Sequence, residues 1–341
     1  MRDDIILAVY VDDILIAGPS INACNAVIHE LSQHIEIVNK SEVKSFLGLK
    51  VIRNHQAQAI SISQPGYIDR LLAKFNMTKV KPAHTPFATG TILIAATDHD
   101  KFCNIERYQE LTGSLNHLAV FSRPDITFAV SKLSKYNANP TTRHFKAALH
   151  VLRYFKGTRN YCIVYSRSTR IPIIDILSYS DSDHASDLDD RKSYTGYVFV
   201  ICGGAVSWST HKQSTVAFSS MESEYMALSD AAREALARKQ FFGELQIPSG
   251  DNPVTILSDG QSALDISENP AKYRKAKHID IQYHAIRHYI HDSKIEVDYI
   301  PTEYQPADLF TKALRTTKHQ RFSGMIGLHN SYEAFRFEEV F

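Results

Sequence analysis

Apolar positions in the first 75 residues fall mainly into short runs typical of strands. Two runs, at 5–11 and 14–17, flank Asp12 and Asp13, which predicts a hairpin with acids at its tip. The first run lies close to Met1, and we expect it to be a buried strand. The order is mixed α+β, because the elements predicted next are a helix at 22–34, strands at 46–52 and 60–63, and a helix at 67–75.

The middle of the chain changes to helical spacing. Two prolines within 81–87 predict a linker, so we place a first boundary at residue 85. Between 107 and 156 apolar residues recur at helical spacing, with breaks at Arg123-Pro124 and Asn139-Pro140. We therefore expect a first unit at 1–85 and a helical connecting region at 86–172.

Beyond Pro172 the pattern returns to strands. The predicted elements are strands at 173–180, 194–201 and 205–210, a long helix at 221–245, a strand at 254–258, shorter helices, and a strand at 295–300. This order predicts an α/β mixed sheet with flanking helices over 173–320 and leaves a tail at 321–341.

Composition favours a multidomain protein and argues against a membrane-spanning or disulfide-rich one. A chain of 341 residues with 44% hydrophobic content suits two or three compact units. The net charge is +1, so any attraction to nucleic acid has to come from local clusters. Cys24, Cys103, Cys162 and Cys202 are scattered, and no long apolar segment occurs, which predicts a reduced intracellular chain without structural zinc or a membrane span.

Four acids of the last third are candidates for chemistry. Asp181 and Asp259 end predicted strands, Glu224 lies early in the long helix, and Asp308 follows the last strand. Carboxylates about 4 Å apart repel by roughly 4 kcal/mol at an effective dielectric near 20, so a cluster of them needs raised pKa values or cations. Oxygen ligands favour Mg²⁺ or Mn²⁺, and two such ions suit phosphodiester cleavage.

Each acid also has an ordinary explanation. Asp183 is an alternative to Asp181, because both lie at the same strand end. Glu222 is explained as the third residue of a capping box that begins at Ser219, whereas Glu224 lies beyond the first turn. Asp308 alone could be a surface acid.

A resemblance then narrows these alternatives. The run Y-S-D-S-D-H-A-S-D from Tyr179, E-S-E-Y-M-A-L, S-D-G-Q-S-A-L, K-H-I-D-I-Q-Y-H and P-T-E-Y-Q-P-A-D-L-F-T-K resemble, in order, the ribonuclease H of copia-type LTR retrotransposons. In that family three Asp and one Glu bind the metal ions, and the matching positions are Asp181, Glu224, Asp259 and Asp308. The chain departs from the family at His184, Ser186 and Ala313, where Trp, Gly and Pro are usual.

The hairpin strengthens the resemblance. Y-V-D-D at 10–13 is similar to the catalytic hairpin of reverse transcriptases, and F-L-G-L-K-V at 46–51 is similar to their primer-supporting segment. The resemblance implies the end of a polymerase palm and thumb, then a connection, then ribonuclease H. Polymerisation in this family needs a third Asp from an earlier strand. We therefore expect Asp12 and Asp13 to be inactive without the upstream polymerase segments.

Basic residues predict a nucleic-acid surface. No Asp or Glu lies between Asp125 and Asp175, whereas the stretch contains nine Lys and Arg residues. The residues expected to contact phosphates, here and in a second cluster, are Arg143, Lys146, Arg153, Lys156, Arg159, Lys272, Arg274, Lys275 and Lys277. A solvated helix face is the alternative explanation.

The sequence thus predicts an endonuclease that cleaves the RNA strand of RNA–DNA hybrids with two divalent ions and no small-molecule cofactor. Its rivals are a non-catalytic nucleic-acid-binding remnant and a DNA-cutting transposase or integrase, whose acid triad is similar. The expected location is intracellular, in a cytoplasmic virus-like particle or the nucleus. A chain trimmed to residue 173 onward is expected to remain active and to be more soluble.

Overall fold

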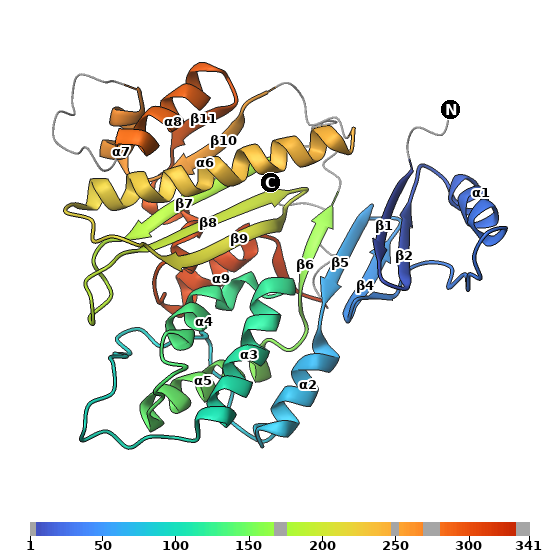
Figure 1. Ribbon diagram of the computed structural model, residues 1–341. Coiled ribbons are helices and arrows are strands. Elements are labelled where there is room, and N and C mark those ends of the chain that lie inside the picture. The colour runs from blue at the N-terminus through green and yellow to red at the C-terminus, as the bar shows by residue number, and fades with distance from the viewer. Residues whose placement is uncertain (1–4, 167–175, 247–251, 269–279, 332–341) are drawn as a thin grey trace.

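The described part of the chain contains three β-sheets, and Figure 1 shows helices between and beside them. The computed structural model describes residues 5–166, 176–246, 252–268 and 280–331. The sheets are a two-stranded hairpin, a five-stranded mixed sheet and a five-stranded antiparallel sheet. The described part contains no helix that is both long and apolar enough to cross a membrane.

The mixed sheet contains the segments expected to bear the acids. Its strands, in the spatial order β11-β10-β7-β8-β9, are β7 (Leu177–Asp183), β8 (Tyr194–Ile201), β9 (Gly204–Lys212), β10 (Val254–Ser258) and β11 (Ile295–Tyr299). β7, β8 and β9 form an antiparallel meander, and β10 lies parallel to both β7 and β11. The strand and helix order predicted for this part of the chain is confirmed.

Both faces of the mixed sheet are covered. One face carries α6 (Ser220–Glu244), α7 (Gln261–Glu268) and α8 (Asp280–His291), and the other carries the 3₁₀ helix η4 (Pro306–Phe310) and α9 (Thr316–Met325). Along β8, Phe199 and Ile201 pack toward α6, while Val198 and Val200 pack toward η4 and α9. Since strand side chains alternate between faces, burial on both sides explains why residues 197–201 of β8 form an unbroken apolar run.

Helices predicted for the connecting region form a second core. They are α3 (Ile105–Phe121), η1 (Pro124–Ile126), α4 (Thr127–Ser134) and α5 (Thr142–Gly157). Pro124 and Pro140 lie at the helix boundaries, as their missing N–H groups require. The same core includes Ile68, Leu71 and Leu72 of α2 (Pro65–Lys74), so packing continues across residue 85.

The antiparallel sheet joins distant segments. Its order is β12-β6-β5-β4-β3, from β3 (Ser45–Phe46), β4 (Leu49–Asn54), β5 (Ala59–Ser63), β6 (Tyr161–Ser166) and β12 (Leu328–Asn330). β6 and β12 were not predicted, since a strand of six or three residues beside helices leaves little pattern. Residues 321–331 are not a loose tail: Phe322, Ile326 and Leu328 are buried.

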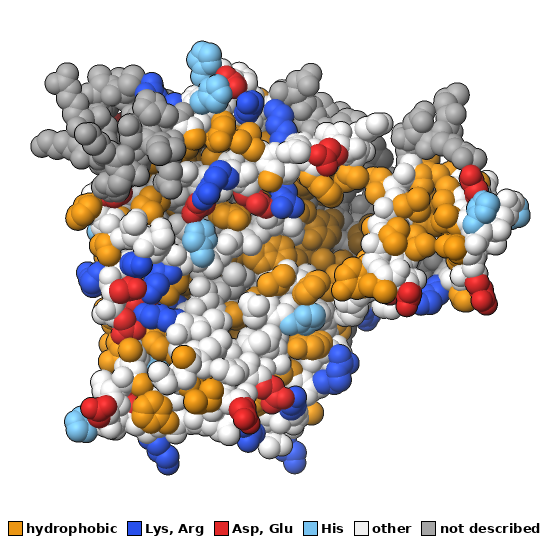
Figure 2. Space-filling model, in the orientation of Figure 1, with side chains coloured by type: hydrophobic (Ala, Val, Ile, Leu, Met, Phe, Trp, Pro, Cys, Tyr) orange, Lys and Arg blue, Asp and Glu red, His pale blue; other side chains and the backbone are white. Residues whose placement is uncertain are grey.

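The N-terminal hairpin is present but not buried. β1 (Ile6–Tyr10) pairs with β2 (Asp13–Ala17), and α1 (Ile21–Ser32) follows. Val9 and Val11 are 67% and 82% exposed, so the expectation of a buried strand was wrong. Figure 2 shows hydrophobic side chains gathered over this part of the molecule. An apolar run had predicted the strand, but burial depends on a packing partner that the pattern does not reveal.

Connecting helices and mixed sheet share an interface. Trp208 Nε1 of β9 donates to the carbonyl oxygen of Ala119 over 2.7 Å, and Phe128 meets Tyr194 edge to face. Lys135, the C-cap residue of α4, forms ion pairs with Asp187 and Asp189, which lie between β7 and β8.

A buried ion pair lies where α9 meets the helical core. The fully buried Arg123 and Asp125 pair over 2.7 Å. His319 of α9 forms a 3.4 Å hydrogen bond with the Asp125 carbonyl oxygen. This packing argues against an independent unit that starts at residue 173.

Residues 173–341 expressed alone are expected to be less soluble and less stable than the whole chain. The truncation exposes the face of β9 and strips Asp187 and Asp189 of their lysine partner. Sedimentation and thermal unfolding of the two proteins test this. A monodisperse fragment with an unchanged melting temperature would contradict it.

Candidate metal centre

Asp181 and Asp259 are neighbours because of strand direction and register. β7 and β10 run parallel, with Leu257 opposite Tyr179. Two residues farther along each strand direction come Asp259 and Asp181. The carboxyl ends of parallel strands meet at one edge of the sheet, so the pairing of β7 with β10 brings the two carboxylates together.

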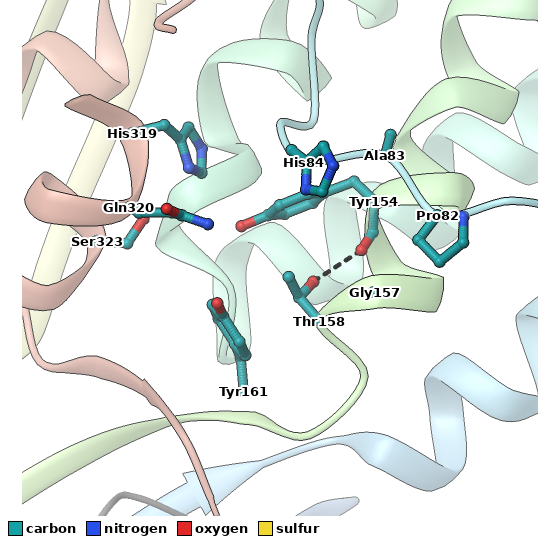
Figure 3. A pocket seen from close by; sticks show the side chains of 10 residues that line it. All are labelled: Pro82, Ala83, His84, Tyr154, Gly157, Thr158, Tyr161, His319, Gln320 and Ser323. Carbon is teal, nitrogen blue, oxygen red and sulfur yellow. Dashed lines mark hydrogen bonds between the residues drawn. The ribbon is translucent and has the colours of Figure 1, made fainter. Parts of the chain in front are cut away.

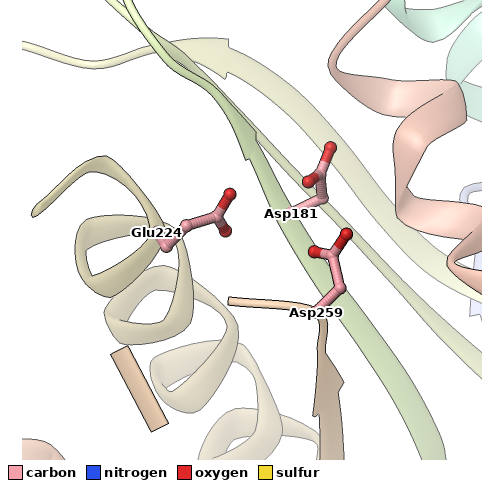
Figure 4. Close-up of side chains that lie close together, drawn as sticks. All are labelled: Asp181, Glu224 and Asp259. Atoms are coloured by element: carbon pink, nitrogen blue, oxygen red, sulfur yellow. The ribbon is translucent and has the colours of Figure 1, made fainter. Parts of the chain in front are cut away.

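Glu224 of α6 completes a group of three acids. Its ligand oxygen and those of Asp181 and Asp259 all lie within 4.8 Å of one another. Figure 4 shows Glu224 reaching from the helix toward the two strand-end acids. A 2.8 Å hydrogen bond from Ser182 Oγ to Ser223 Oγ ties this turn of α6 to β7.

Two acids that were alternatives in the sequence, Asp183 and Glu222, lie outside the three-acid group. Asp181, and not Asp183, belongs to the three-acid group. Ser219 caps α6 by accepting from the backbone N–H of Glu222, while Glu222 Oε2 accepts from that of Phe218 over 2.9 Å. Glu222 is therefore occupied as a helix-capping acid.

Asp308 lies close to this group without being part of it. It is fully buried in η4, so it is not a surface acid. Its Oδ1 lies 2.7 Å from Lys312 Nζ, and its Oδ2 accepts from Lys318 Nζ over 2.5 Å. Lys312 Nζ is also 3.4 Å from Asp181 Oδ2. The ammonium groups of Lys312 and Lys318 thus both offset the charge of Asp308, and that of Lys312 also links Asp308 to Asp181.

Neutral side chains position the acids, and the sequence analysis missed them. Gln305 Nε2 donates to the carbonyl oxygens of Ser180 and Leu257, which lie on β7 and β10. Thr302 Oγ1, in the 3₁₀ helix η3 (Thr302–Tyr304), donates to Asp259 Oδ2 over 2.6 Å. Thr311 Oγ1 donates to Asp181 Oδ2. All three belong to P-T-E-Y-Q-P-A-D-L-F-T-K, where only Asp308 had been assigned a role.

Two glycines allow the close approaches. Gly196 lies opposite Asp181 on β8, and a Cβ there would lie 2.6 Å from the Cβ of Phe310, so no other residue lets η4 sit against the sheet. A Cβ on Gly260 would lie 3.0 Å from Glu224 Cγ. Both positions therefore control where an acid is held.

Burial and mutual repulsion raise the pKa values of two of the acids, Asp181 and Glu224. Burial raises the pKa of Asp181 to about 8; Lys312 opposes the shift, and Asp308 and Asp259 add to it. Burial and the charges of Asp181 and Asp259 raise the pKa of Glu224 well above its usual value. Lys312 shows the reverse response, because Asp181 and Asp308 raise its pKa although burial lowers it.

The three-acid group fits a hard divalent cation. Glu224 Oε2 is buried and accepts no hydrogen bond from the described residues, so it is an available ligand atom. Carboxylate oxygens are the donors that Mg²⁺ and Mn²⁺ prefer. A bound cation would also remove the repulsion that raises the two pKa values.

Other residues singled out in the sequence lie elsewhere. Asp12 forms the hairpin turn and Asp13 begins β2; both are exposed, and Lys40 Nζ is 3.8 Å from Asp13 Oδ1. Within the described ranges they join no third acid in a metal-binding arrangement. Lys272, Arg274, Lys275 and Lys277 lie outside the described residues.

Two arginines of the acid-free stretch form ion pairs with Asp residues from other segments of the chain. Arg159 forms a bidentate pair with Asp69, and Arg143 pairs with Asp100. Arg153 Nε donates to the Lys81 carbonyl oxygen. Lys146 and Lys156 are exposed. A stretch of sequence without acids therefore does not form a surface without acids, because Asp residues from other segments lie beside its arginines.

A cavity of about 270 Å³ lies between the 82–84 segment, the end of α5 and α9. Figure 3 shows Tyr154, Tyr161, His84 and His319 around it. None of the four acids lines it. Its position beside the buried Arg123 network indicates a packing gap between the two cores.

The stability of the metal-free chain is expected to fall as the pH rises from about 4 to 8. Asp181 keeps its proton in the folded chain up to about pH 8 but releases it near 3.8 when unfolded, so folding takes up a proton in this window. The slope is at most roughly 1.4 kcal/mol per pH unit for one proton. Thermal unfolding in chelator should show a flatter pH dependence for Asp181→Asn. Equal slopes would contradict the burial argument.

Gly260→Ala is expected to weaken Mn²⁺ binding by roughly tenfold to a hundredfold, because the new methyl displaces Glu224. Gly243→Ala is the matched control in α6, since a Cβ there meets nothing within 4 Å. Calorimetric titration of both variants measures the effect. Unchanged binding in Gly260→Ala would show that Glu224 is not a ligand.

Comparisons with known proteins agree with this architecture. Residues 1–89 match the family described as reverse transcriptase (RNA-dependent DNA polymerase). The chain is 35% identical over 332 residues to the retrovirus-related Pol polyprotein from transposon TNT 1-94 of Nicotiana tabacum, which covers 96% of this chain and 24% of that protein. It is 32% identical over 232 residues to a transposon Ty5-1 protein of Saccharomyces cerevisiae, covering 67% of this chain and 73% of that protein.

A solved structure supports the fold. The foamy viral protease-reverse transcriptase in complex with RNA/DNA hybrid matches with a TM-score of 0.51 and 13% identity, over 87% of this chain and 36% of that one. The chain spans about a quarter of the length of the tobacco polyprotein. It belongs to the Pol polyproteins of copia-type LTR retrotransposons, with the end of a reverse transcriptase joined to a ribonuclease H-like fold.

Proposed function

We propose that the mixed-sheet unit hydrolyses the RNA strand of RNA–DNA hybrids with the help of divalent metal ions. The convergence of Asp181, Glu224 and Asp259 within 4.8 Å carries this proposal. Three carboxylates in one place, Asp181 buried and Glu224 and Asp259 partly buried, are unfavourable without cations, and a divalent ion among them suits phosphodiester cleavage.

The chain's own residues would divide the work as follows. Asp181 and Asp259 present oxygens to a common point, with orientations set by Thr311 and Thr302. Glu224 offers its unpartnered oxygen from the opposite side. These three acids, with Asp308 close by, would hold the Mg²⁺ or Mn²⁺ ions, whose chemistry when bound is activation of water and stabilisation of the charge on the departing 3′-oxygen.

Two observations favour a hybrid as the substrate. The foamy viral relative of the same fold was solved with an RNA/DNA hybrid. Residues 1–89 match the family described as reverse transcriptase (RNA-dependent DNA polymerase), and copying RNA into DNA produces an RNA–DNA hybrid. A DNA-cutting transposase with a similar triad is disfavoured, because the reverse-transcriptase match occupies residues 1–89.

Polymerisation by this 341-residue chain is not part of the proposal. Asp12 and Asp13 are exposed at the hairpin, and no third carboxylate joins them within the described ranges. Nucleotidyl transfer by two ions needs carboxylates on both sides of the ion pair.

The cleavage of a labelled RNA–DNA hybrid by the purified chain in Mg²⁺ tests the function. Asp259→Asn is expected to abolish cleavage while the fold persists, since the amide keeps the shape but loses the charge. Glu222→Gln should retain activity and cost about 1 kcal/mol or less, because its amide oxygen can still accept from Phe218.

Wild-type turnover by Asp259→Asn would rule out the proposed centre. Loss of activity in Glu222→Gln with an unchanged melting temperature would mean that the wrong glutamate was chosen. A wild-type chain that binds the hybrid in Mg²⁺ but never cleaves it would favour the non-catalytic remnant.

Phosphate contacts by α5 are tested through salt dependence. Lys146→Ala with Lys156→Ala is expected to lower the slope of log affinity against log salt by somewhat under one for each lost contact. Arg159→Ala should change the slope less, because its guanidinium is already paired with Asp69. Equal slopes in all three proteins would make this stretch a solvated face.

A further inference from the structure

Lys312 holds a position that a cation shared by two acids would take. Its Nζ lies 2.7 Å from Asp308 Oδ1 and 3.4 Å from Asp181 Oδ2. The carboxylates of Asp308 and Asp181 are buried, whereas the lysine side chain is 35% exposed. The ammonium therefore lies between the fourth acid and the three-acid group and offsets the negative charge of both Asp308 and Asp181.

The four acids are consequently not equivalent. Glu224 has an oxygen that accepts no hydrogen bond from any described residue, so the three-acid group is open to a ligand. Asp308 has both oxygens beside ammonium groups: Lys318 donates a hydrogen bond to Oδ2, whereas Lys312 approaches Oδ1 as an ion pair without hydrogen-bond geometry, so its contact is the easier one to displace. A divalent ion that binds Asp308 has to displace at least one of these contacts.

Local geometry explains why Lys312 reaches both acids. It follows Asp308 by four residues, one helical turn, so its side chain returns over that carboxylate. Thr311, the preceding residue, donates to Asp181 and draws this turn against β7. Gly196 leaves the room for that approach.

We propose that Lys312 is a built-in cation at the Asp181–Asp308 position, which makes metal loading sequential. The first divalent ion enters the three-acid group, and a second binds at Asp308 only when the Lys312 ammonium withdraws toward solvent. The proposal rests on the metal-dependent function proposed above and adds the residue that sets the occupancy of the second site.

Lys318 provides the matched control. Its Nζ contacts Asp308 Oδ2 and lies 5.1 Å from the centre of the Phe322 ring, and within the described residues it forms no ion pair with Asp181. Removal of Lys318 deletes one ammonium from Asp308 but leaves the shared one in place. A general loss of positive charge would therefore affect both variants, whereas competition for the shared position is specific to Lys312.

The test is Mn²⁺ binding to the whole chain without nucleic acid, followed by calorimetry and by the electron paramagnetic resonance signal of free Mn²⁺. The wild type should bind one ion tightly and a second one weakly. Lys312→Met should tighten the second site by roughly tenfold to a hundredfold, the gain expected when one charge-assisted contact no longer competes. Lys318→Met should change the second site by much less.

Two further variants keep the test decisive. Lys312→Arg retains the charge and should preserve the weak second site, which reports on the proposal even if Lys312→Met does not fold. Asp308→Asn in the Lys312→Met background should remove the gained affinity.

Equal second-site affinity in the wild type and Lys312→Met, or an equal gain in Lys318→Met, would overturn the proposal. Failure of the underlying function looks different. If Asp259→Asn leaves the tight Mn²⁺ site of the wild type unchanged, the three-acid group is not the metal centre, and both proposals fall.

Discussion

Repulsion between buried carboxylates is the constraint around which the mixed-sheet unit is arranged. Parallel pairing of β7 and β10 forces Asp181 and Asp259 to one sheet edge, and α6 adds Glu224. At an effective dielectric near 20, each charged pair at about 4 Å costs roughly 4 kcal/mol. A fold that keeps these acids has to supply hydrogen bonds, protons or cations, and the structure contains all three kinds of response.

The responses come from one short segment. Between Thr302 and Lys318 the chain provides the hydroxyl on Asp259, the amide of Gln305 that bonds to two strands, and both lysines of Asp308. Such a segment can serve the site only if it lies against the sheet, which Gly196 permits. Within this segment η4 packs on α9, and α9 in turn contacts the helical core through His319. The position of the acids thus depends on helices that come from an earlier part of the chain.

Much of this arrangement could be predicted from the sequence, for identifiable reasons. Alternating and helical periods located most strands and helices, and the ends of predicted strands marked Asp181 and Asp259, although β7 continues past Asp181 to Asp183. The capping pattern separated Glu222 from Glu224 correctly. What failed were properties that depend on distant partners. β6 pairs with β12, which lies more than 160 residues later in the sequence. Arg159 meets Asp69 across 90 residues, which no local count of charges reveals.

Two pairs of acids in this chain show how context decides chemistry. Asp12 and Asp13 are adjacent in sequence and match a familiar hairpin, yet they are exposed to water, where charge is screened. Asp181 and Asp259 lie 78 residues apart, and burial of Asp181 at their meeting point raises its pKa to about 8. A desolvated group binds a cation more strongly because fewer waters compete for its oxygens. Burial of Asp181, which has no counterpart in the exposed hairpin, therefore makes the second pair the better candidate for a divalent cation.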